Sequence, residues 1–510
     1  MPRDLSSLTR WESDWAGLRV VVAGLGLSGF AAADTLIELG ARVLVVDGTD
    51  NEDHRGRADT LKIVGALDVR LGTEHTATLP DVDGGRPDLL VVSPGWRPSH
   101  PVLTQARAES VPIWSEIELA WRVQTREGRP APQWLCITGT NGKTTTVTMT
   151  EEILRQAGLR AVACGNVGTP VLDVVREPDG YDVLAVELSS FQLEHTYSLS
   201  PVASVVLNLA EDHVDWHGSF EAYAAAKAKI HERAQVAAIY NAEDLATVKM
   251  VEDADVVDGC RAIGFTTQVP AVSQLGVVDG LLVDRAYIEQ RQSSAAELAT
   301  LEDLGDPAPR HTVANALAAA ALTRAVGVPA TAVQEGLRHY DRGEHRIQVV
   351  ADVDGVRWID DSKATNPHAA HASLSAFPSI VWIAGGLAKG VEYEDLIRSH
   401  AHQLRAVVLI GTDDAALVAA LAEHAPDVPV LDIAEQSPLP ATADKSALGN
   451  EVMRRAVATA LERARSGDTV LMAPASASMD QFVSYAHRGK AFATAVADQV
   501  VNGQEPDGAE

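Results

Sequence analysis

The chain has 510 residues, 46% of them hydrophobic, which is enough for about three domains that each bury a core. Its formal net charge is −28, from 70 acidic and 42 basic residues, and a field of that sign disfavours nucleic acid and anionic membrane surfaces as partners. We expect a cytoplasmic protein without membrane insertion, because no apolar run could span a bilayer, the N-terminus has no secretory-signal pattern, and the three cysteines suggest neither a metal site nor a disulfide framework.

The first region alternates strands and helices, which is typical of a parallel sheet. A strand is predicted at 19–23, a glycine-rich turn at 24–29 and a helix at 30–39. A second strand at 42–46 ends at Asp47, and a third at 88–92 leads to Gly95. A glycine turn followed by an acid predicts a nucleotide or pyrophosphate site. Nicotinamide binding, or a helix simply packed closely on a strand, stays open as an alternative.

A second glycine-rich loop, at 139–145, lies between a strand at 134–138 and a helix that reaches about residue 156. Its backbone N–H groups suit phosphate oxygens, Lys143 supplies a positive charge and the Thr144 hydroxyl suits Mg²⁺. The spacing is not that of the common P-loop, since Gly139 lies closer to Lys143. The alternative is a plain turn with a solvated lysine.

Polar residues follow the next two strands. Glu187 follows a strand at 182–186, and a strand at 203–207 leads to His213. Because the carboxyl ends of parallel strands meet at one edge of a sheet, we expect both near the phosphate loop. A carboxylate there is a plausible Mg²⁺ ligand, whereas His213 alone could merely cap a loop. Lys227 lies in a predicted Ala-rich helix, where the pattern alone predicts a solvated lysine.

The stretch 268–310 reads as irregular, with a hairpin turn at 279–280, and precedes a buried Ala-rich helix at 313–325. A last region opens with a predicted hairpin of strands at 348–352 and 356–360. Strands at 380–384, 406–410 and 469–473 then alternate with helices, which predicts a doubly wound sheet. The tail from residue 503 is expected to be disordered.

Loops of small and polar residues follow three of these last strands, at 361–366, 385–390 and 474–478. Two of them carry lysines, Lys363 and Lys389, which suit a second anionic substrate; ordinary turn chemistry is the alternative. We therefore predict an α/β protein of three domains with mainly parallel sheets. They are a Rossmann-like domain at 1–130, a P-loop ATPase-like domain at 131–342 and a Rossmann-like domain at 343–510.

The loop Gly-Thr-Asn-Gly-Lys-Thr-Thr at 139–145, the run Glu-Leu-Ser-Ser-Phe-Gln at 187–192 and the motifs at 361–366 and 476–482 together resemble the Mur ligase family of peptidoglycan synthesis. The last two motifs resemble those of the D-glutamate-adding member. The resemblance implies ATP-dependent addition of D-glutamate to UDP-N-acetylmuramoyl-L-alanine through an acyl phosphate. It also implies a role in cell-wall formation, cell shape and division, and we expect a monomer.

The resemblance also implies roles for individual residues. The UDP-precursor would be bound by Leu27, Ser28, Asp47, Gly95, Asn166 and Ser189. ATP would be bound by Gly139, Thr140, Asn141, Gly142, Lys143, Thr144, Thr145, Asn315, Arg346 and Asp361. D-glutamate would be bound by Lys363, Thr365, Lys389, Ser478 and Tyr485. Two Mg²⁺ ions would be held by Thr144, Glu187, His213 and a carbamate on Lys227, and the catalytic set would be Lys143, Glu187, His213 and Lys227.

Some residues depart from the family pattern. Thr312 stands where asparagine is common, Gly48 where threonine is common and Tyr485 where phenylalanine is frequent. A folate polyglutamate ligase would not need the first glycine turn with Asp47. A non-catalytic nucleotide-binding scaffold could lack Glu187, Lys227 and His213 together, and a nicotinamide oxidoreductase would leave the second glycine loop unused.

Overall fold

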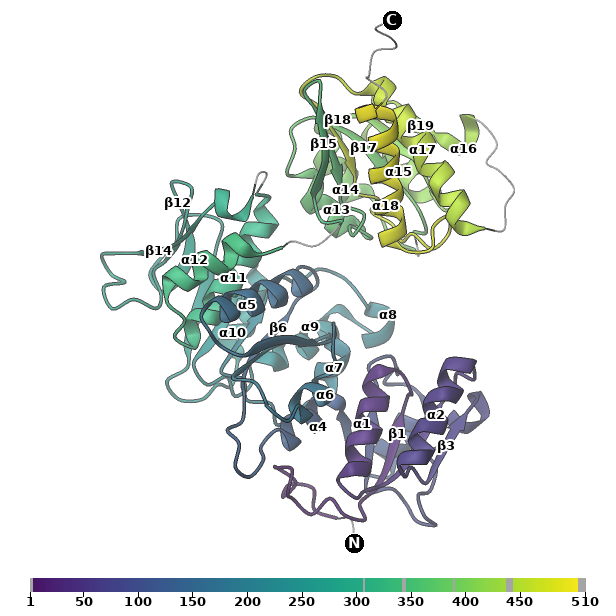
Figure 1. Ribbon diagram of the computed structural model, residues 1–510, viewed down its shortest axis with the longest axis vertical. Helices are drawn as coiled ribbons and strands as arrows, with labels where there is room; N and C mark the ends of the chain where they lie inside the picture. Colours follow the sequence, from purple (N-terminus) through teal and green to yellow (C-terminus); the bar gives the residue numbers. More distant parts are fainter. Residues whose placement is uncertain (1–2, 306–307, 342–344, 389, 437–443, 503–510) are drawn as a thin grey trace, which may run out of the picture. The chain divides into compact units, whose positions relative to one another are not determined.

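The computed structural model of the protein describes residues 3–305, 308–341, 345–388, 390–436 and 444–502 (Figure 1). In this part of the chain there are three sheets. The chain divides into two compact units, one of Met1–Asp306 with Thr312–Tyr340 and one of Pro307–His311 with Asp341–Glu510. The first unit holds two of the sheets. The predicted boundary at 342/343 and the predicted disordered tail lie outside the described residues.

The first sheet is five-stranded and entirely parallel, in the order β3-β2-β1-β4-β5. Its strands are β1 (Arg19–Ala23), β2 (Arg42–Asp47), β3 (Asp68–Leu71), β4 (Leu89–Val92) and β5 (Ile113–Ser115). The helices are α1 (Leu27–Glu38), α2 (Glu52–Val64), α3 (Pro101–Ala108) and α4 (Glu116–Val123), with the 3₁₀ turn η1 (Thr73–Thr76).

Helix α1 begins three residues earlier than predicted. Gly26, in extended backbone, is its N-cap, so Leu27, Ser28 and Gly29 form the first helical turn rather than part of the glycine turn. Gly29 permits this close approach, since a Cβ there would lie only 2.0 Å from the carbonyl oxygen of Gly24. The polar side chain of Ser28 therefore stands at the open end of a helix.

The second sheet is nine-stranded, in the order β14-β13-β12-β11-β10-β9-β6-β8-β7. Strands β6 to β12 pair in parallel, and β13 pairs antiparallel with both β12 and β14. Its strands are β6 (Gln133–Thr138), β7 (Ala161–Gly165), β8 (Val183–Glu187), β9 (Ala203–Val206), β10 (Ala237–Asn241), β11 (Arg261–Phe265), β12 (Gln274–Val278), β13 (Leu281–Asp284) and β14 (Ala296–Thr300).

The prediction of an irregular stretch at 268–310 is wrong, because it contains β12, β13 and β14. These strands have at most five residues each and are separated by polar loops, so their periodicity is weak. The predicted hairpin turn at Asp279 and Gly280 is confirmed, since Val278 pairs with Leu281.

Helices cover this sheet, and the Ala-rich helix is buried as predicted. They are α5 (Lys143–Gln156), α6 (Val171–Arg176), α7 (Ser190–Glu194), α8 (Val214–His217), α9 (Phe220–Ala228), α10 (Leu245–Asp253), α11 (Arg310–Ala325) and α12 (Ala330–His339), with the 3₁₀ turns η2 (Lys229–His231) and η3 (Glu302–Leu304). Helix α12 packs against α5, which begins at Lys143. The contact is so close that a Cβ on Gly336 would lie 2.5 Å from the Cα of Ile153.

The third sheet is six-stranded, in the order β15-β16-β20-β17-β18-β19, with only β15 antiparallel. Its strands are β15 (Gln348–Val353), β16 (Val356–Asp360), β17 (Ile380–Ala384), β18 (Leu404–Leu409), β19 (Val430–Asp432) and β20 (Thr469–Met472). The helical segments are α13 (Pro367–Leu374), α14 (Glu394–His400), η4 (Ala401–Gln403), α15 (Ala415–His424), α16 (Ile433–Gln436), α17 (Lys445–Arg463), α18 (Tyr485–Val496) and η5 (Ala497–Val501).

Both faces of the third sheet are buried. On β17, Trp382 belongs to one core cluster, whereas its neighbours Val381 and Ile383 belong to the cluster on the other face. Helices on both faces of a parallel sheet define the predicted doubly wound arrangement. In the described part of the chain no helix combines the length and apolar character needed to cross a membrane.

The contact of Gly336 with α5 gives a first prediction. Gly336→Ala should lower the free energy of unfolding by about 1–3 kcal/mol, because the added methyl group overlaps the Ile153 backbone. Urea denaturation followed by circular dichroism measures it. Gly56→Ala is the matched control, because Gly56 lies on α2 with nothing within 4 Å of an added Cβ; it should stabilise by about 0.5–1 kcal/mol. Equal stabilisation by both changes would contradict the packing described.

Candidate active site

Three loops meet at one edge of the second sheet because the strands before them are neighbours. Strand β6 lies between β8 and β9, with Ile137 opposite Glu187 and Thr138 opposite Val206. The glycine loop that follows β6 therefore lies beside Glu187, which is the last residue of β8 rather than the residue after it. The expectation that these strand ends converge is confirmed.

The glycine loop is shaped to accept an anion. Gly139 and Gly142 have φ of 153° and 83°, which disfavour other residues, and a Cβ on Gly142 would lie 2.4 Å from Asn315 Oδ1. Asn208 fixes the loop, as its Oδ1 accepts from the Asn141 N–H at 2.9 Å. Among the described residues no side chain caps the start of α5. Backbone N–H groups at such a helix start suit phosphate oxygens.

Two lysines converge on this loop. Lys143 Nζ donates to the carbonyl oxygens of Gly139 and Thr140, both at 2.9 Å. Lys227 Nζ donates to the same Gly139 oxygen at 2.9 Å and to Thr138 Oγ1 at 3.3 Å. Burial lowers the pKa of Lys143, and burial followed by the nearby Lys143 lowers the pKa of Lys227 well below its ordinary value. The prediction of a solvated Lys227 is wrong, because the residue is only 2% exposed.

Oxygen ligands stand beside the loop. Thr144 Oγ1 donates to Glu187 Oε2 at 3.0 Å, and Asn166 Nδ2 donates to Glu187 Oε1 at 2.9 Å. A hydroxyl and a carboxylate so close together fit the hard oxygen set that Mg²⁺ prefers. In the described ranges no three His, Cys, Asp or Glu side chains gather as a metal site. The predicted Mg²⁺ ligands include only two residues of these four types, Glu187 and His213.

His213 lies apart from this hydrogen-bonded group. It precedes α8 in a left-handed conformation, with φ of 53°, and its side chain is 47% exposed. The imidazole lies 3.4 Å from Asp212 and 4.8 Å from the Phe191 ring. Its placement with Glu187 as a metal ligand therefore stays a prediction.

Sequence reasoning gave no role to Tyr223. Its hydroxyl is 2.9 Å from Thr140 Oγ1, and its ring lies 4.8 Å from Lys227 Nζ. The signal was its position four residues before Lys227, on the same face of α9. The tyrosine thus joins the glycine loop to the helix that carries the buried lysine.

Asp47 holds the first glycine turn. Its Oδ2 accepts from the Leu25 N–H at 2.6 Å and its Oδ1 from the Thr49 N–H at 2.7 Å. Arg57 donates to the Leu25 carbonyl oxygen at 3.0 Å, so both the N–H and the carbonyl group of Leu25 are held by side chains. Leu27, half-buried Ser28 and exposed Gly95 surround the same strand ends. Their role in holding the UDP-precursor stays a prediction, whereas Asp47 shapes the turn itself.

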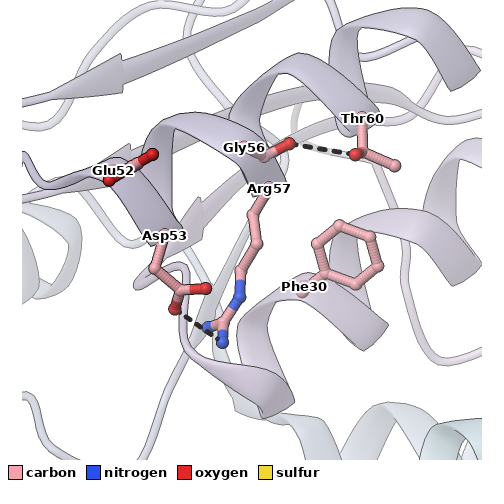
Figure 2. Close-up of a pocket in the computed structure, with 6 residues that line it drawn as sticks. All are labelled: Phe30, Glu52, Asp53, Gly56, Arg57 and Thr60. Carbon is pink, nitrogen blue, oxygen red and sulfur yellow. Dashed lines mark hydrogen bonds and ion pairs between the residues drawn. The ribbon is translucent and has the colours of Figure 1, made fainter.

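An open groove of about 600 Å³ lies between α1 and α2 beside this turn (Figure 2). Figure 2 shows Arg57 directed toward Asp53, to which it is ion-paired at 2.9 Å, with the Phe30 ring facing it from α1. The groove is lined by Phe30, Glu52, Asp53, Gly56, Arg57 and Thr60.

The three strand-end loops of the third sheet are also neighbours. Gly385 N–H donates to the Pro474 carbonyl oxygen at 2.8 Å, and Ala475 N–H donates to the Ala364 carbonyl oxygen at 3.0 Å. Burial raises the pKa of Asp361 to about 6, against the opposing effect of a hydrogen bond from the Ser373 hydroxyl.

The predicted D-glutamate residues lie around these loops. Lys363 Nζ lies 3.9 Å from the centre of the Tyr485 ring, and Ser478 is buried. Thr365 follows Lys363 on the same loop, and Arg346 adds a positive charge near Asp361. Lys389 lies outside the described residues.

Arg488 is a residue that sequence reasoning missed. It is fully buried on α18 and donates to Ser362 Oγ at 3.0 Å and to the Ser476 carbonyl oxygen at 3.1 Å. It thus ties together two of the predicted substrate loops. A helical arginine usually lies in solvent, so the pattern carried no signal of this role.

Three mainly parallel α/β domains, with a glycine loop beside a hydroxyl–carboxylate pair, are typical of nucleotide-dependent transferases and ligases. Family models match three successive parts of the chain: Mur ligase MurD-like, N-terminal domain (residues 18–115), Mur ligase middle domain (137–323) and Mur ligase, glutamate ligase domain (345–476). The chain belongs to the Mur ligase family, whose members are ATP-dependent enzymes that form amide bonds and use Mg²⁺.

Two relatives are named UDP-N-acetylmuramoylalanine–D-glutamate ligase. The protein of Streptomyces coelicolor is 53% identical over 484 residues, covering 95% of this chain and 98% of that one. The protein of Leifsonia xyli is 49% identical over 516 residues, covering 99% and 97%. Among solved structures, MurF of Acinetobacter baumannii has a TM-score of 0.54 at 16% identity, covering 89% of this chain and 90% of that one. Its likeness confirms the predicted fold class.

The segment behind Lys227 gives a second prediction. His231 is buried in η2, its Nδ1 lies 2.8 Å from Ser204 Oγ on β9, and burial lowers its pKa to about 3. Between that value and the ordinary pKa of 6.5, the unfolded chain binds a proton that the folded chain does not, so stability falls as the pH falls. Between about pH 7 and about pH 5, the free energy of unfolding of His231→Phe should fall by about 2 kcal/mol less than that of the parent.

Urea denaturation at the two pH values measures this difference. Ser204→Ala is the control, because it removes the hydrogen bond and keeps the buried imidazole, so the pH dependence should remain. If His231→Phe and the parent lose stability equally, the buried neutral histidine is refuted.

Proposed function

We propose that this chain joins D-glutamate to UDP-N-acetylmuramoyl-L-alanine in an ATP-dependent reaction of peptidoglycan synthesis. The observation that carries the proposal is the 53% identity, over nearly both full lengths, to a relative that bears the corresponding name. The enzyme would work in the cytoplasm as a monomer.

The UDP-precursor would lie along one side of the first unit. Leu27, Ser28, Asp47 and Gly95 would hold the uridine and its diphosphate at the first glycine turn. Asn166 and Ser189 would contact the sugar–alanine end. In support, Asn166 is hydrogen-bonded to Glu187, which is also bonded to Thr144 of the phosphate loop. The precursor carboxyl would therefore end beside the phosphoryl donor.

ATP would bind the second glycine loop. The backbone N–H groups of Gly139–Thr145 would hold its phosphates, and Asn315, packed against Gly142, would contact the nucleotide. Arg346 and Asp361 of the second unit are the other proposed ATP contacts. Mg²⁺, held by Thr144, Glu187, His213 and modified Lys227 as two ions, would neutralise phosphate charge.

The residues of the chain activate a poor electrophile. A carboxylate does not acylate an amine, so its conversion to an acyl phosphate comes first. Lys143, fixed by two carbonyl oxygens, would stabilise charge on the transferring phosphoryl group. The neutral amine of D-glutamate then attacks the acyl carbon, and phosphate leaves as the amide forms. D-glutamate would be held by Lys363, Thr365, Lys389, Ser478 and Tyr485.

Lys227 would act as a carbamate. Its neutral amine attacks CO₂ to form an N–C bond and releases a proton, so the side chain becomes an anion with two oxygens. In support, burial and Lys143 favour the neutral amine that this reaction needs. A protonated Lys227 would instead repel both Lys143 and a bound cation. Its sequence neighbours Ala224, Ala225, Ala226 and Ala228 have small side chains, which leave room for the larger group.

The third prediction tests the reaction and the loop together. The parent should release phosphate from ATP only when both UDP-N-acetylmuramoyl-L-alanine and D-glutamate are present at saturation. Lys143→Ala should lower this rate at least about a hundredfold, because a positioned charge is lost from the phosphoryl site.

Lys249→Ala is the control for the third prediction, since Lys249 forms an exposed ion pair with Asp253 on α10. If phosphate release by the parent does not depend on the two substrates, the proposed function is overturned. A Lys143→Ala rate within a few fold of the parent would overturn only the role of Lys143.

The fourth prediction concerns the carbamate. Lys227→Ala should lose about a hundredfold in rate, and added acetate or propionate should restore part of it by supplying carboxylate oxygens in the vacated space. Lys143→Ala should not respond to the same acids. Near-normal turnover of Lys227→Ala in CO₂-depleted buffer would refute the carbamate.

A further inference from the structure

Glu116 is a buried carboxyl that the proposed chemistry does not use. It is the first residue of α4 and only 2% exposed. Helix α4 packs against both α1, which carries Ser28, and α7, whose N-cap is Ser189 (Figure 1). Glu116 thus stands between the two places where the precursor is proposed to bind.

Gln192 joins Glu116 to Ser189. Its Nε2 donates to Glu116 Oε1 at 2.8 Å, and its Oε1 accepts from the Ser189 N–H at 2.8 Å. A backbone N–H can only donate, so the amide oxygen of Gln192 must face Ser189 and its NH₂ must face Glu116. The Ser189 hydroxyl is also 3.1 Å from Gln192 Oε1 and receives the Gln192 N–H at 3.2 Å. The Ser189 N–H therefore fixes which way round Gln192 sits, and Glu116 accepts from the NH₂ group that results.

Among the described residues, no cation contributes to the pKa shift of Glu116. Burial raises its pKa, against smaller opposing effects from Gln192, from its own backbone amide and from Ser28. Within the residues that the structure describes, its Oε2 has no hydrogen-bond partner. Relative to an ordinary glutamate, this shift favours the neutral form of the carboxyl.

Glu118, on the same helix, differs from Glu116 because its contacts stabilise the fold. Glu118 is ion-paired with Arg122 at 2.6 Å and accepts from the N–H groups of Tyr197 and Ser198, both at 2.8 Å. The ion pair lies within α4, and the contacts with Tyr197 and Ser198 tie α4 to the segment that follows α7. Glu116 instead accepts from Gln192 Nε2, and Ser28 at the start of α1 also acts on its carboxyl.

We infer that Glu116 and Gln192 form a positioning pair that sets Ser189 relative to the first glycine turn, and so determines how well the UDP-precursor is held at both ends. This inference rests on the proposed function and adds two residues to it. Neither side chain needs to touch the reacting atoms, so the pair should act on precursor affinity rather than on the chemical step.

The test compares KM values for the three substrates. Glu116→Ala leaves the Gln192 NH₂ without its acceptor, and should raise the KM for UDP-N-acetylmuramoyl-L-alanine about tenfold. The KM values for ATP and D-glutamate, and kcat, should stay within about twofold. Glu116→Gln keeps an oxygen for Gln192 and should restore the parental KM. Glu118→Gln should lower the thermal unfolding midpoint and leave the ratio of the three KM values unchanged.

Two results would overturn the inference: parental precursor KM in folded Glu116→Ala, or equal increases in all three KM values. If Glu116→Ala does not fold, Gln192→Leu tests the same link from the other side, and must raise the same KM. The precursor KM of a variant with both Glu116→Ala and Gln192→Leu should be no higher than that of either single variant, because both changes break the same connection. A parent that fails to turn over the precursor refutes the proposed function instead, so the two failures are distinguishable.

Discussion

The pairing of β6 with β8 on one side and β9 on the other is the constraint on which the candidate site depends. Parallel pairing brings the ends of the three strands to one edge, so the glycine loop, Glu187 and Asn208 meet although they are distant in sequence. A register shift of one residue would turn Glu187 to the other face of the sheet. The buried runs of Val, Leu and Ile in these strands therefore determine the site as firmly as its polar residues do.

The Gly139 carbonyl oxygen lies at the centre of the electrostatics of this site. It accepts from both Lys143 and Lys227, and one carbonyl dipole cannot offset two ammonium charges in a partly dry environment. The lower pKa of Lys227 eases this conflict because it favours the neutral amine. A chain with a net charge of −28 thus concentrates its positive potential at one loop, where anionic phosphates are expected.

Strong local patterns were predictable from the sequence. The bounds of β1, β16 and α5 agree with the predicted ones, because an apolar run marks β1, an Asp–Gly turn precedes β16 and a glycine loop precedes α5. The strands β12 to β14 were missed, since short strands in a polar stretch owe their stability to pairing rather than to their own pattern. The buried state of Lys227, the anchoring role of Asp47 and the loop contacts of Arg488 depend on long-range packing, which no local pattern encodes.

The contact between Gly142 and Asn315 links two positions that are far apart in the sequence. A side chain at 142 would collide with the Asn315 amide, and the backbone at 142 also disfavours anything but glycine. A smaller residue at 315 would relieve the collision but would leave the backbone strain in place. Each single change is unfavourable by itself, so neither prepares the chain for the other. Substitutions at 142 and 315 should therefore be rare, and correlated, across descendants of this gene. Such epistasis would keep the nucleotide loop unchanged while the surfaces around it diverge.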